Sequence, residues 1–400
     1  MAKEREFKRK KLKNGLTILF EKRKLPVVTS SVTCKFGSEF ESLKLKGVAH
    51  FIEHLVFKGT KNRDVRQISQ EIEKKGGIIN AFTSEEFTSY WNKLPSKYLD
   101  VGIDIASDLA LNPLLESEAL ERERKVILEE IKMYNDSPRD YVINKIKELL
   151  YKKPFGLFGA GTIETISKMR RKDVLKTFDS AYATNNMILT VIGKANFDDI
   201  CEIAEKIFPS SKRKIIERKP IKINKQLIEK RKGVDQANVV LGYHAPSLCG
   251  KSRYAAELLN VILGRGMSSR LFQEVREKRG LAYAVKGALE QDKNYGYELI
   301  YVGTVKEKVK EVKELILKEI KKLRQLERRD FQEAQEQLIG LKKVESENVE
   351  QVMLDLISEE NAGNVNEYYK YEEKIKGISL RDVRNLAKLK GYSFIALIPN

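Results

Sequence analysis

The stretch His50-Phe51-Ile52-Glu53-His54-Leu55-Val56-Phe57-Lys58-Gly59-Thr60 contains two of the three histidines in this 400-residue chain. The two histidines are four residues apart, apolar residues fill the positions around them in a helical pattern, and Gly59 is a typical helix end. Residues four apart lie on one face of a helix, so both imidazoles can reach a single ion. The stretch therefore predicts a helix that carries a metal site on one face.

Glu53 directly precedes the second histidine and completes the pattern HxxEH. This is the spacing of the inverzincins, in which two histidines bind zinc and the glutamate acts as a general base on water. A histidine on a half-apolar helix is more often structural than a ligand, but the composition of this chain gives only roughly 0.003 chance occurrences of the motif. We therefore predict that His50 and His54 bind a metal ion and that Glu53 is the base.

Length and composition limit the classes of protein to consider. Four hundred residues suit two domains of about 200 residues each. The chain contains no apolar run of about 18 residues, and its basic N-terminal segment lacks the apolar core of a signal peptide. Three cysteines without CxxC spacing indicate a reducing compartment and no cysteine metal cluster. We expect a cytoplasmic protein that does not bind membranes.

The formal net charge of +18 is concentrated in one stretch. Lys212 to Lys232 contains ten basic and two acidic residues, which is nearly half of the excess charge. Pro209, Pro220 and the scarcity of large apolar residues are typical of an exposed linker, which we place at residues 209–233. Lys/Glu-rich surfaces also occur in hyperthermophile proteins, and no nucleic-acid-binding motif accompanies the charge. A basic nucleic-acid-binding protein is therefore only a remote alternative.

The first half of the chain alternates predicted strands and helices around the HxxEH helix. β-Prone runs bounded by turn residues indicate strands, and apolar residues at helical spacing indicate helices. The predicted strands are Leu16–Glu21, Val27–Phe36, Ile78–Thr83 and Thr88–Leu94, and the predicted helices are Asp64–Lys75, Tyr98–Leu111 and Glu116–Tyr134.

The last of these helices is rich in carboxylates that could complete a metal site. Zinc in enzymes commonly has three protein ligands and an open position for water, so a carboxylate must join the two histidines. Glu121, Glu123, Glu129 and Glu130 flank the apolar segment 126–128, and spacing alone does not choose among them.

Three segments of the chain resemble the M16 (pitrilysin) metallopeptidases, namely Gly47–Thr60, Gly77–Ser84 and Glu123–Ile131. The most similar branch is M16B, that of the mitochondrial processing peptidase beta subunit and its prokaryotic relatives. The resemblance implies that Glu130 is the third metal ligand. It also implies that Glu123, two helical turns earlier, supports the ligands without contacting the ion, and that Glu121 and Glu129 are surface charges.

The same resemblance implies residues that bind the substrate. Asn80 and Ala81 match an Asn-Ala pair on an edge strand, where the family holds an extended peptide as an added strand. Arg276 and Tyr283 match an Arg/Tyr pair seven residues apart in a domain opposite the zinc, where the two side chains would donate to a substrate carbonyl and to the oxyanion. His244 is alone on a predicted strand, and we interpret it as structural.

The second half of the chain repeats the first. Ala256–Gly266 aligns with Ala49–Gly59, apolar with apolar, but Glu257 and Val261 replace the two histidines. We therefore expect an α+β protein with two duplicated α/β domains of the mitochondrial-processing-peptidase-like (LuxS/MPP-like) metallohydrolase type. The zinc-binding catalytic domain is residues 1–208, the basic linker is 209–233, and the second domain, without metal and with the Arg/Tyr pair, is 234–400.

The resemblance implies a zinc-dependent endopeptidase with one Zn²⁺ per chain. A complete clamshell in this family has four such domains and this chain supplies two, so we expect a homodimer, with a hetero-partner of the same fold as the alternative. Its closed chamber would admit unfolded peptides or presequence-like segments. A non-catalytic scaffold subunit of the same fold is the alternative function, although such relatives have degraded ligands and this chain retains them all.

Overall fold

The computed structural model describes residues 6–214 and 218–400. The chain divides into two compact units. Unit 1 contains the described residues of 1–132, 159–218 and 348–357, and unit 2 contains 133–158, 219–347 and 358–400. The units are therefore not continuous in sequence as the predicted domains are, since 133–158 and 348–357 are each exchanged between the two halves.

Unit 1 is built on a mixed sheet. In the described part of the chain this sheet has six strands, in the order β1-β2-β6-β3-β5-β4. β2 and β6 are parallel, and the other neighbours are antiparallel. β4 is thus an edge strand of this sheet, and the HxxEH helix packs against it. The strands are β1 Phe7–Lys11, β2 Thr17–Lys22, β3 Val27–Cys34, β4 Ile78–Thr83, β5 Thr88–Pro95 and β6 Met187–Gly193.

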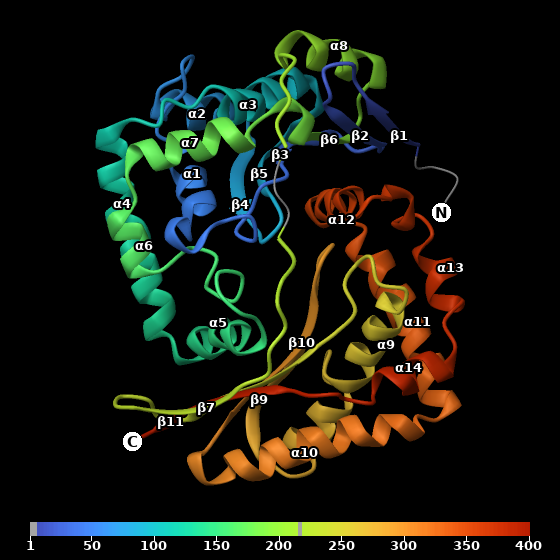
Figure 1. Ribbon diagram of the computed structural model, residues 1–400. Helices are drawn as coiled ribbons and strands as arrows, with labels where there is room; N and C mark the ends of the chain where they lie inside the picture. The colour runs from blue at the N-terminus through green and yellow to red at the C-terminus, as the bar shows by residue number, and fades with distance from the viewer. Residues whose placement is uncertain (1–5, 215–217) are drawn as a thin grey trace. The chain divides into compact units, whose positions relative to one another are not determined.

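The predicted HxxEH helix is confirmed as α1, Val48–Val56. Its apolar side chains Phe51, Ile52, Leu55 and Val56 are at most 1% exposed, which explains why this stretch is helical and how it is held. α1 packs on β4 and β5, while α3 (Leu99–Leu111) packs across β3 and β5 (Figure 1). Other helices of this unit are α2 Val65–Glu73, α6 Ile163–Lys168, α7 Arg171–Ala181 and α8 Phe197–Ile207.

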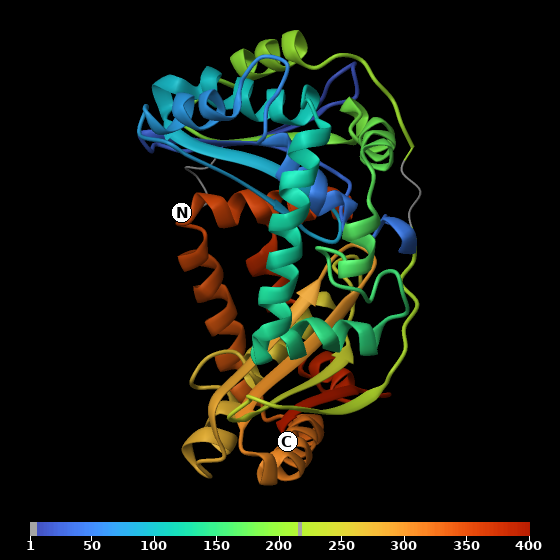
Figure 2. The ribbon, with the colours of Figure 1, turned by 90° about the vertical axis from the view of Figure 1, so that its left-hand side faces the viewer.

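The carboxylate-rich helix α4 runs from Ser117 to Asp136 and is seen along its length in Figure 2. It buries Leu120, Glu123, Ile127 and Ile131, which recur every three or four residues and so form one stripe. Glu123 is thus buried in the apolar stripe of a charged helix. A buried carboxylate needs partners, and the partners of Glu123 lie on α1 and in the turn that follows it.

Unit 2 is built on a second sheet, five-stranded within the described residues, in the order β7-β11-β8-β10-β9. Alternate residues of β8 point to two separate cores: Leu241 packs with α9, α10 and α11 (Figure 1), and Val240 packs with α5. The strands are β7 Gln226–Arg231, β8 Ala237–His244, β9 Ala282–Gln291, β10 Gly296–Thr304 and β11 Ser393–Pro399. The helices are α5 Pro138–Leu150, α9 Arg253–Leu263, α10 Val309–Lys322, α11 Arg328–Glu345, α13 Tyr371–Lys376 and α14 Leu380–Leu386. A further helix, α12 (Val349–Ala362), belongs to unit 1 up to residue 357 and to unit 2 beyond it.

The two sheets share one topology. The order β7-β11-β8-β10-β9 of unit 2 corresponds to the order β2-β6-β3-β5-β4 of unit 1. In both orders the first two strands are parallel, and each later pair of neighbours is antiparallel. In unit 1, α1 follows β3 and carries most of the segment Ala49–Gly59. In unit 2, α9 follows β8 and carries most of the aligned segment Ala256–Gly266. The expected α+β fold of two duplicated halves is therefore confirmed.

The predicted linker requires one correction. Within 209–233, Gln226–Arg231 forms β7, which pairs in parallel with β11 at the edge of the sheet. Its residues alternate between exposed and half-buried, and an edge strand tolerates lysine and arginine on its outer face, so a basic composition did not exclude a strand here. Residues 215–217 of the linker lie outside the described part of the chain.

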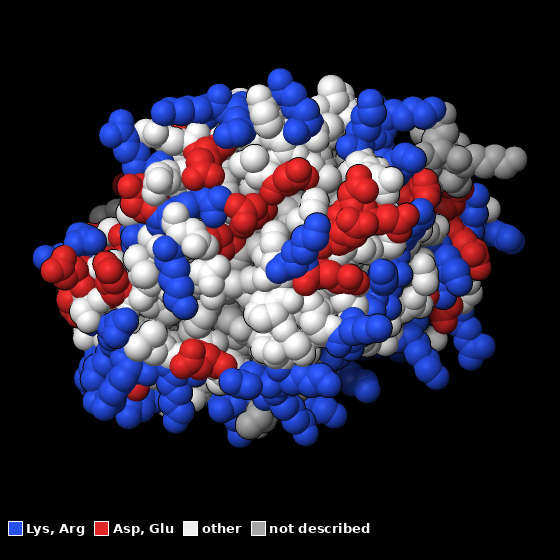
Figure 3. Space-filling model, turned by 90° about the horizontal axis from the view of Figure 1, so that it is seen from above, with Lys and Arg blue, Asp and Glu red and all other residues white. Residues whose placement is uncertain are grey.

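Charged side chains are interspersed on the face of the molecule in Figure 3, where Lys and Arg lie among Asp and Glu. Acidic and basic side chains also pair along α4, as Arg124 does with Glu121 at 2.9 Å and Lys132 with Glu129 at 2.7 Å.

Among the described residues, no helix combines the length and the apolar character needed to cross a membrane.

Candidate metal centre

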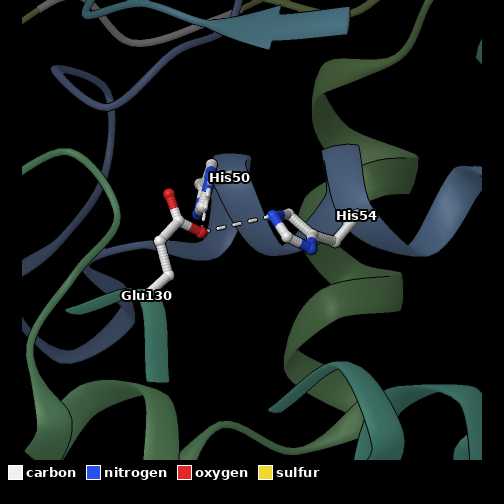
Figure 4. Close-up of side chains that lie close together, drawn as sticks. All are labelled: His50, His54 and Glu130. Atoms are coloured by element: carbon white, nitrogen blue, oxygen red, sulfur yellow. Dashed lines mark ion pairs between the residues drawn. The ribbon is translucent and has the colours of Figure 1, made fainter. Parts of the chain in front are cut away.

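Three predicted ligands converge from two helices of unit 1. His50 and His54 lie on one face of α1, and Glu130 reaches them from α4 (Figure 4). Glu130 Oε2 lies 3.7 Å from His50 Nε2 and 3.6 Å from His54 Nε2. One donor atom from each of the three residues lies within 4.8 Å of the other two. The structure therefore brings together the ligand set that the sequence and the resemblance predict.

The position of His54 is fixed by a hydrogen bond on the far side of its ring. Its Nδ1 lies 3.1 Å from Glu123 Oε2, and the other oxygen of Glu123 pairs with Lys58 Nζ at 2.9 Å. With Nδ1 engaged by a buried carboxylate, Nε2 is left facing Glu130. Metal-binding histidines are commonly held in this way, which is the supporting role that the resemblance implies for Glu123.

The ionisation of His50 also suits a metal ligand. Burial lowers the pKa of its imidazole to about 4, helped by the neighbouring His54 and opposed by Glu130. His50 is therefore neutral at physiological pH, which is the form that binds metal ions. Its Nδ1 is buried and has no hydrogen-bond partner among the described residues.

In contrast to His50, the neighbours of His54 and Glu130 favour the charged forms of these two side chains. Burial disfavours the charged form of His54, but the bonds to Glu130 and Glu123 outweigh it and raise the pKa of this imidazole. The hydrogen bond from His54 lowers the pKa of Glu130, against the effect of its burial, so the carboxylate is the stable form.

These three residues fit a zinc ion. Two nitrogens and one carboxylate oxygen are a donor set that zinc accepts. Ligand atoms about 2.0–2.1 Å from a tetrahedral zinc lie about 3.4 Å apart, close to the separations of 3.6 and 3.7 Å seen here. Three protein ligands leave a fourth position open, as in catalytic zinc sites.

Glu53 lies on the same helix, three residues after His50, and contacts strand β4. Its Oε2 accepts a hydrogen bond of 2.5 Å from Thr83 Oγ1. Burial raises the pKa of the Glu53 carboxyl group, and the hydrogen bond from Thr83 opposes this effect. Glu53 is thus a carboxyl group beside the metal ligands, with one oxygen held and the other available.

The predicted substrate-binding pair lies on the strand that ends the sheet of unit 1. Asn80 and Ala81 are both in β4, which has β5 as its single neighbouring strand among the described residues. The Asn80 side-chain oxygen accepts a hydrogen bond of 2.8 Å from the backbone N–H of Ala81. α1 packs on this strand, so the pair is on the element that also holds Glu53 through Thr83.

Arg276 and Tyr283 are placed together in unit 2. Arg276 lies in a short π-helix, Phe272–Glu277, and its guanidinium carbon is 5.3 Å from the centre of the Tyr283 ring. Tyr283 lies on β9, the counterpart of β4 in the second sheet, and is 82% exposed. The Arg276 guanidinium also lies 4.8 Å from the centre of the Phe272 ring, and its Nε is 3.8 Å from Glu277 Oε1, so the exposed Tyr283 is held beside an arginine that has other contacts.

Two residues of the site were not predicted from the sequence. Lys58 follows His54 by four residues, so helical spacing could have indicated that it reaches the same surface. Thr83 follows Ala81 by two residues, on the same face of β4, which strand alternation could have indicated. The expected structural role of His244 agrees with a bond of 3.0 Å between its Nε2 and the Ile223 carbonyl.

Comparison with known proteins defines the class of this chain. The family profile described as "Insulinase (Peptidase family M16)" matches residues 17–158, and the one described as "Peptidase M16 inactive domain" matches residues 168–338. An uncharacterized zinc protease of Rickettsia felis is 35% identical over 318 residues, which are 78% of this chain and 76% of the relative. The uncharacterized zinc protease YmxG of Bacillus subtilis is 30% identical over 341 residues, 83% of each chain.

Solved structures show the same fold at lower identity. A protease from Helicobacter pylori superposes with a TM-score of 0.92 at 23% identity, over 99% of this chain and 100% of that one. A peptidase M16 inactive domain from Pseudomonas fluorescens superposes with a TM-score of 0.90 at 18% identity, over 99% and 98% of the two chains. The fold is that of the M16 peptidases. With the two profiles and the zinc protease relatives, this chain belongs to peptidase family M16.

Proposed function

We propose that this chain is a zinc-dependent endopeptidase of the inverzincin type that cleaves unfolded peptides. The observation that carries the proposal is the convergence of His50, His54 and Glu130 with the carboxyl group of Glu53 beside them. Degraded ligands are expected in a scaffold subunit, whereas all three ligands and the base are retained here. The zinc protease relatives add support at the level of the family.

His50, His54 and Glu130 would hold one zinc ion per chain. When bound, zinc supplies a positive charge that acidifies water and stabilises negative charge on a carbonyl oxygen. Glu53 accepts a proton from the attacking water and passes it to the nitrogen of the leaving amine. Glu123, itself paired with Lys58, keeps His54 in the ligand orientation throughout.

Strand β4 would bind the substrate as an added strand. The main chain of Ala81 and the side chain of Asn80 would bind the peptide, and an incoming carbonyl would compete with Asn80 Oδ1 for the Ala81 N–H. This mode of binding requires an extended peptide, because a folded protein has few free strand edges. It supports unfolded peptides or presequence-like segments as the class of substrate.

The first test of this proposal is metal removal. Purified protein is expected to contain about one zinc per chain and to hydrolyse peptides from an unstructured panel, because three protein ligands with an open position typify catalytic zinc. A chelator should abolish cleavage, and added zinc should restore it. Zinc at one per chain without cleavage would favour the scaffold function, and absence of metal would overturn the site itself.

We further propose that the active form is a homodimer whose closed chamber is shared by two chains, with a hetero-partner of the same fold as the alternative. Arg276 and Tyr283 would then donate hydrogen bonds to the substrate carbonyl and the oxyanion at the zinc of the partner subunit. We also propose a cytoplasmic location, supported by three free cysteines, Cys34, Cys201 and Cys249.

Complementation tests this arrangement. Glu53→Gln and Tyr283→Phe chains should each be nearly inactive alone, because one lacks the base and the other lacks an oxyanion donor. Mixed dimers contain one site with both groups, so mixing is expected to restore up to about a quarter to a half of the wild-type rate per dimer. The measurement is peptide hydrolysis against mixing ratio, with mass by light scattering. An active isolated monomer, or no recovery in verified mixed dimers, would contradict the proposal.

A further inference from the structure

Thr83 makes a specific contact with the proposed general base. Its Oγ1 donates to Glu53 Oε2 at 2.5 Å, a distance typical of a hydroxyl bonded to a carboxylate. Glu53 Oε1 accepts no hydrogen bond from the described residues. The two oxygens of this carboxyl group are therefore different: one is held by the protein and the other is available to water.

A second hydroxyl, that of Thr88, lies beside the Thr83 hydroxyl and does not compete with Glu53 as its partner. Thr88 Oγ1 lies 3.3 Å from Thr83 Oγ1 and donates to the backbone carbonyl of Phe36 at 3.0 Å. Since that carbonyl can only accept, the Thr88 proton is committed to it and is not shared with Thr83. Thr83 therefore receives no proton from Thr88, and its own single proton is directed at the carboxylate of Glu53, the stronger acceptor.

The backbone adds to this constraint. Thr83 and Thr88 are directly opposite each other in the antiparallel pair of β4 and β5, and Thr88 is fully buried. Both residues are β-branched, so few rotamers are open to them in a strand. Glu53, in contrast, has three rotatable bonds and would sample several positions without a fixed partner.

We propose that Thr83 is a positioning residue for Glu53, whose hydroxyl holds Oε2 and so leaves Oε1 as the oxygen that takes the proton from water. This inference rests on the proposed peptidase function and deepens it, because it assigns the two oxygens of the base. On this proposal β4 has two roles: it binds the substrate, and through Thr83 it positions the carboxyl group of Glu53.

Substitution of the hydroxyl tests the assignment. Thr83→Val keeps the shape and removes the donor, and it is expected to lower kcat by about 10- to 100-fold with KM changed less than about twofold, the range for a misaligned catalytic group. Thr83→Ser keeps the hydroxyl and should recover kcat to within about threefold of wild type. Thr29→Val is the matched control, because Thr29 is a buried strand threonine whose hydroxyl has no hydrogen-bond partner among the described residues.

Readouts other than activity separate the outcomes. Zinc content and zinc affinity should be the same in wild type and Thr83→Val, and a crystal structure of the variant should show the Glu53 carboxyl group turned from its place. Loss of zinc from Thr83→Val would make the residue structural and overturn the inference, as would wild-type kcat in Thr83→Val or a Thr83→Ser variant as slow as Thr83→Val. A wild-type protein that binds no zinc and cleaves nothing would instead overturn the proposed function, and the inference with it.

Discussion

The Glu53→Gln variant is expected to retain one zinc per chain and to lose peptide hydrolysis by about 10³- to 10⁴-fold. An amide of nearly the same size cannot accept the proton of water, and positioned general bases contribute up to about that factor. Glutamine can still accept the hydrogen bond from Thr83, so the helix and the ligands should be undisturbed. The measurement is kcat on an unstructured peptide together with zinc content per chain.

Glu129→Gln is the control for this variant. Glu129 is also a glutamate near the site in sequence, adjacent to Glu130, but its side chain is 70% exposed and pairs with Lys132 at 2.7 Å. Its substitution should leave kcat within about twofold, because an exposed ion pair contributes little. A Glu53→Gln enzyme that cleaves at the normal rate would refute the general-base role, and one that loses zinc would make Glu53 a residue required for metal binding.

The position of the HxxEH helix was predictable because its signal is local. HxxEH at helical spacing, with apolar residues between the ligands, requires no knowledge of distant segments, and α1 has the expected form. Ile78–Thr83 was predicted with its observed bounds for the same reason, since a Gly-Gly break precedes a β-prone run. The predicted third ligand was different: spacing left four glutamates of α4 open, and only the resemblance to a family selected Glu130.

The partners of the site residues were not predictable, because they come from other elements. Glu123 can be buried in a charged helix because one of its oxygens pairs with His54 of α1 and the other with Lys58, which follows α1. Thr83 contacts Glu53 across 30 residues of sequence. β7 was assigned to a linker because its partner, β11, is the last strand of the chain, so nothing near Gln226–Arg231 indicated a sheet.

The segment before α1 contains another contact that was not predicted from the sequence, a buried ion pair at the start of the HxxEH helix. Glu41 accepts hydrogen bonds from the backbone N–H groups of Gly47, at 3.0 Å, and Ala49, at 2.8 Å. Its oxygen Oε2 pairs with Lys46 Nζ at 3.2 Å, and both side chains are fully buried. Lys46 also donates to the Ser38 carbonyl at 2.8 Å. A carboxylate thus satisfies N–H groups that a helix start leaves without partners.

Lys46→Met is therefore expected to lower the free energy of unfolding by about 3–5 kcal/mol, the cost of leaving one member of a buried ion pair without the other. Methionine fills most of the same volume, so the loss would come from the charge on Glu41 and not from a cavity. The measurement is urea unfolding in the presence of a chelator, so that zinc binding does not hide the effect.

Two further variants distinguish the ion pair from other effects of the substitution. Lys44→Met changes an exposed lysine of the same segment and should cost no more than about 0.5 kcal/mol. Adding Glu41→Gln to Lys46→Met removes the unpaired charge and should recover part of the loss, because a buried pair costs most when only one member is removed. If Lys46→Met unfolded at the wild-type midpoint, the pair would not stabilise the start of α1. The orientation of His50 would then depend on the buried apolar face of the helix alone.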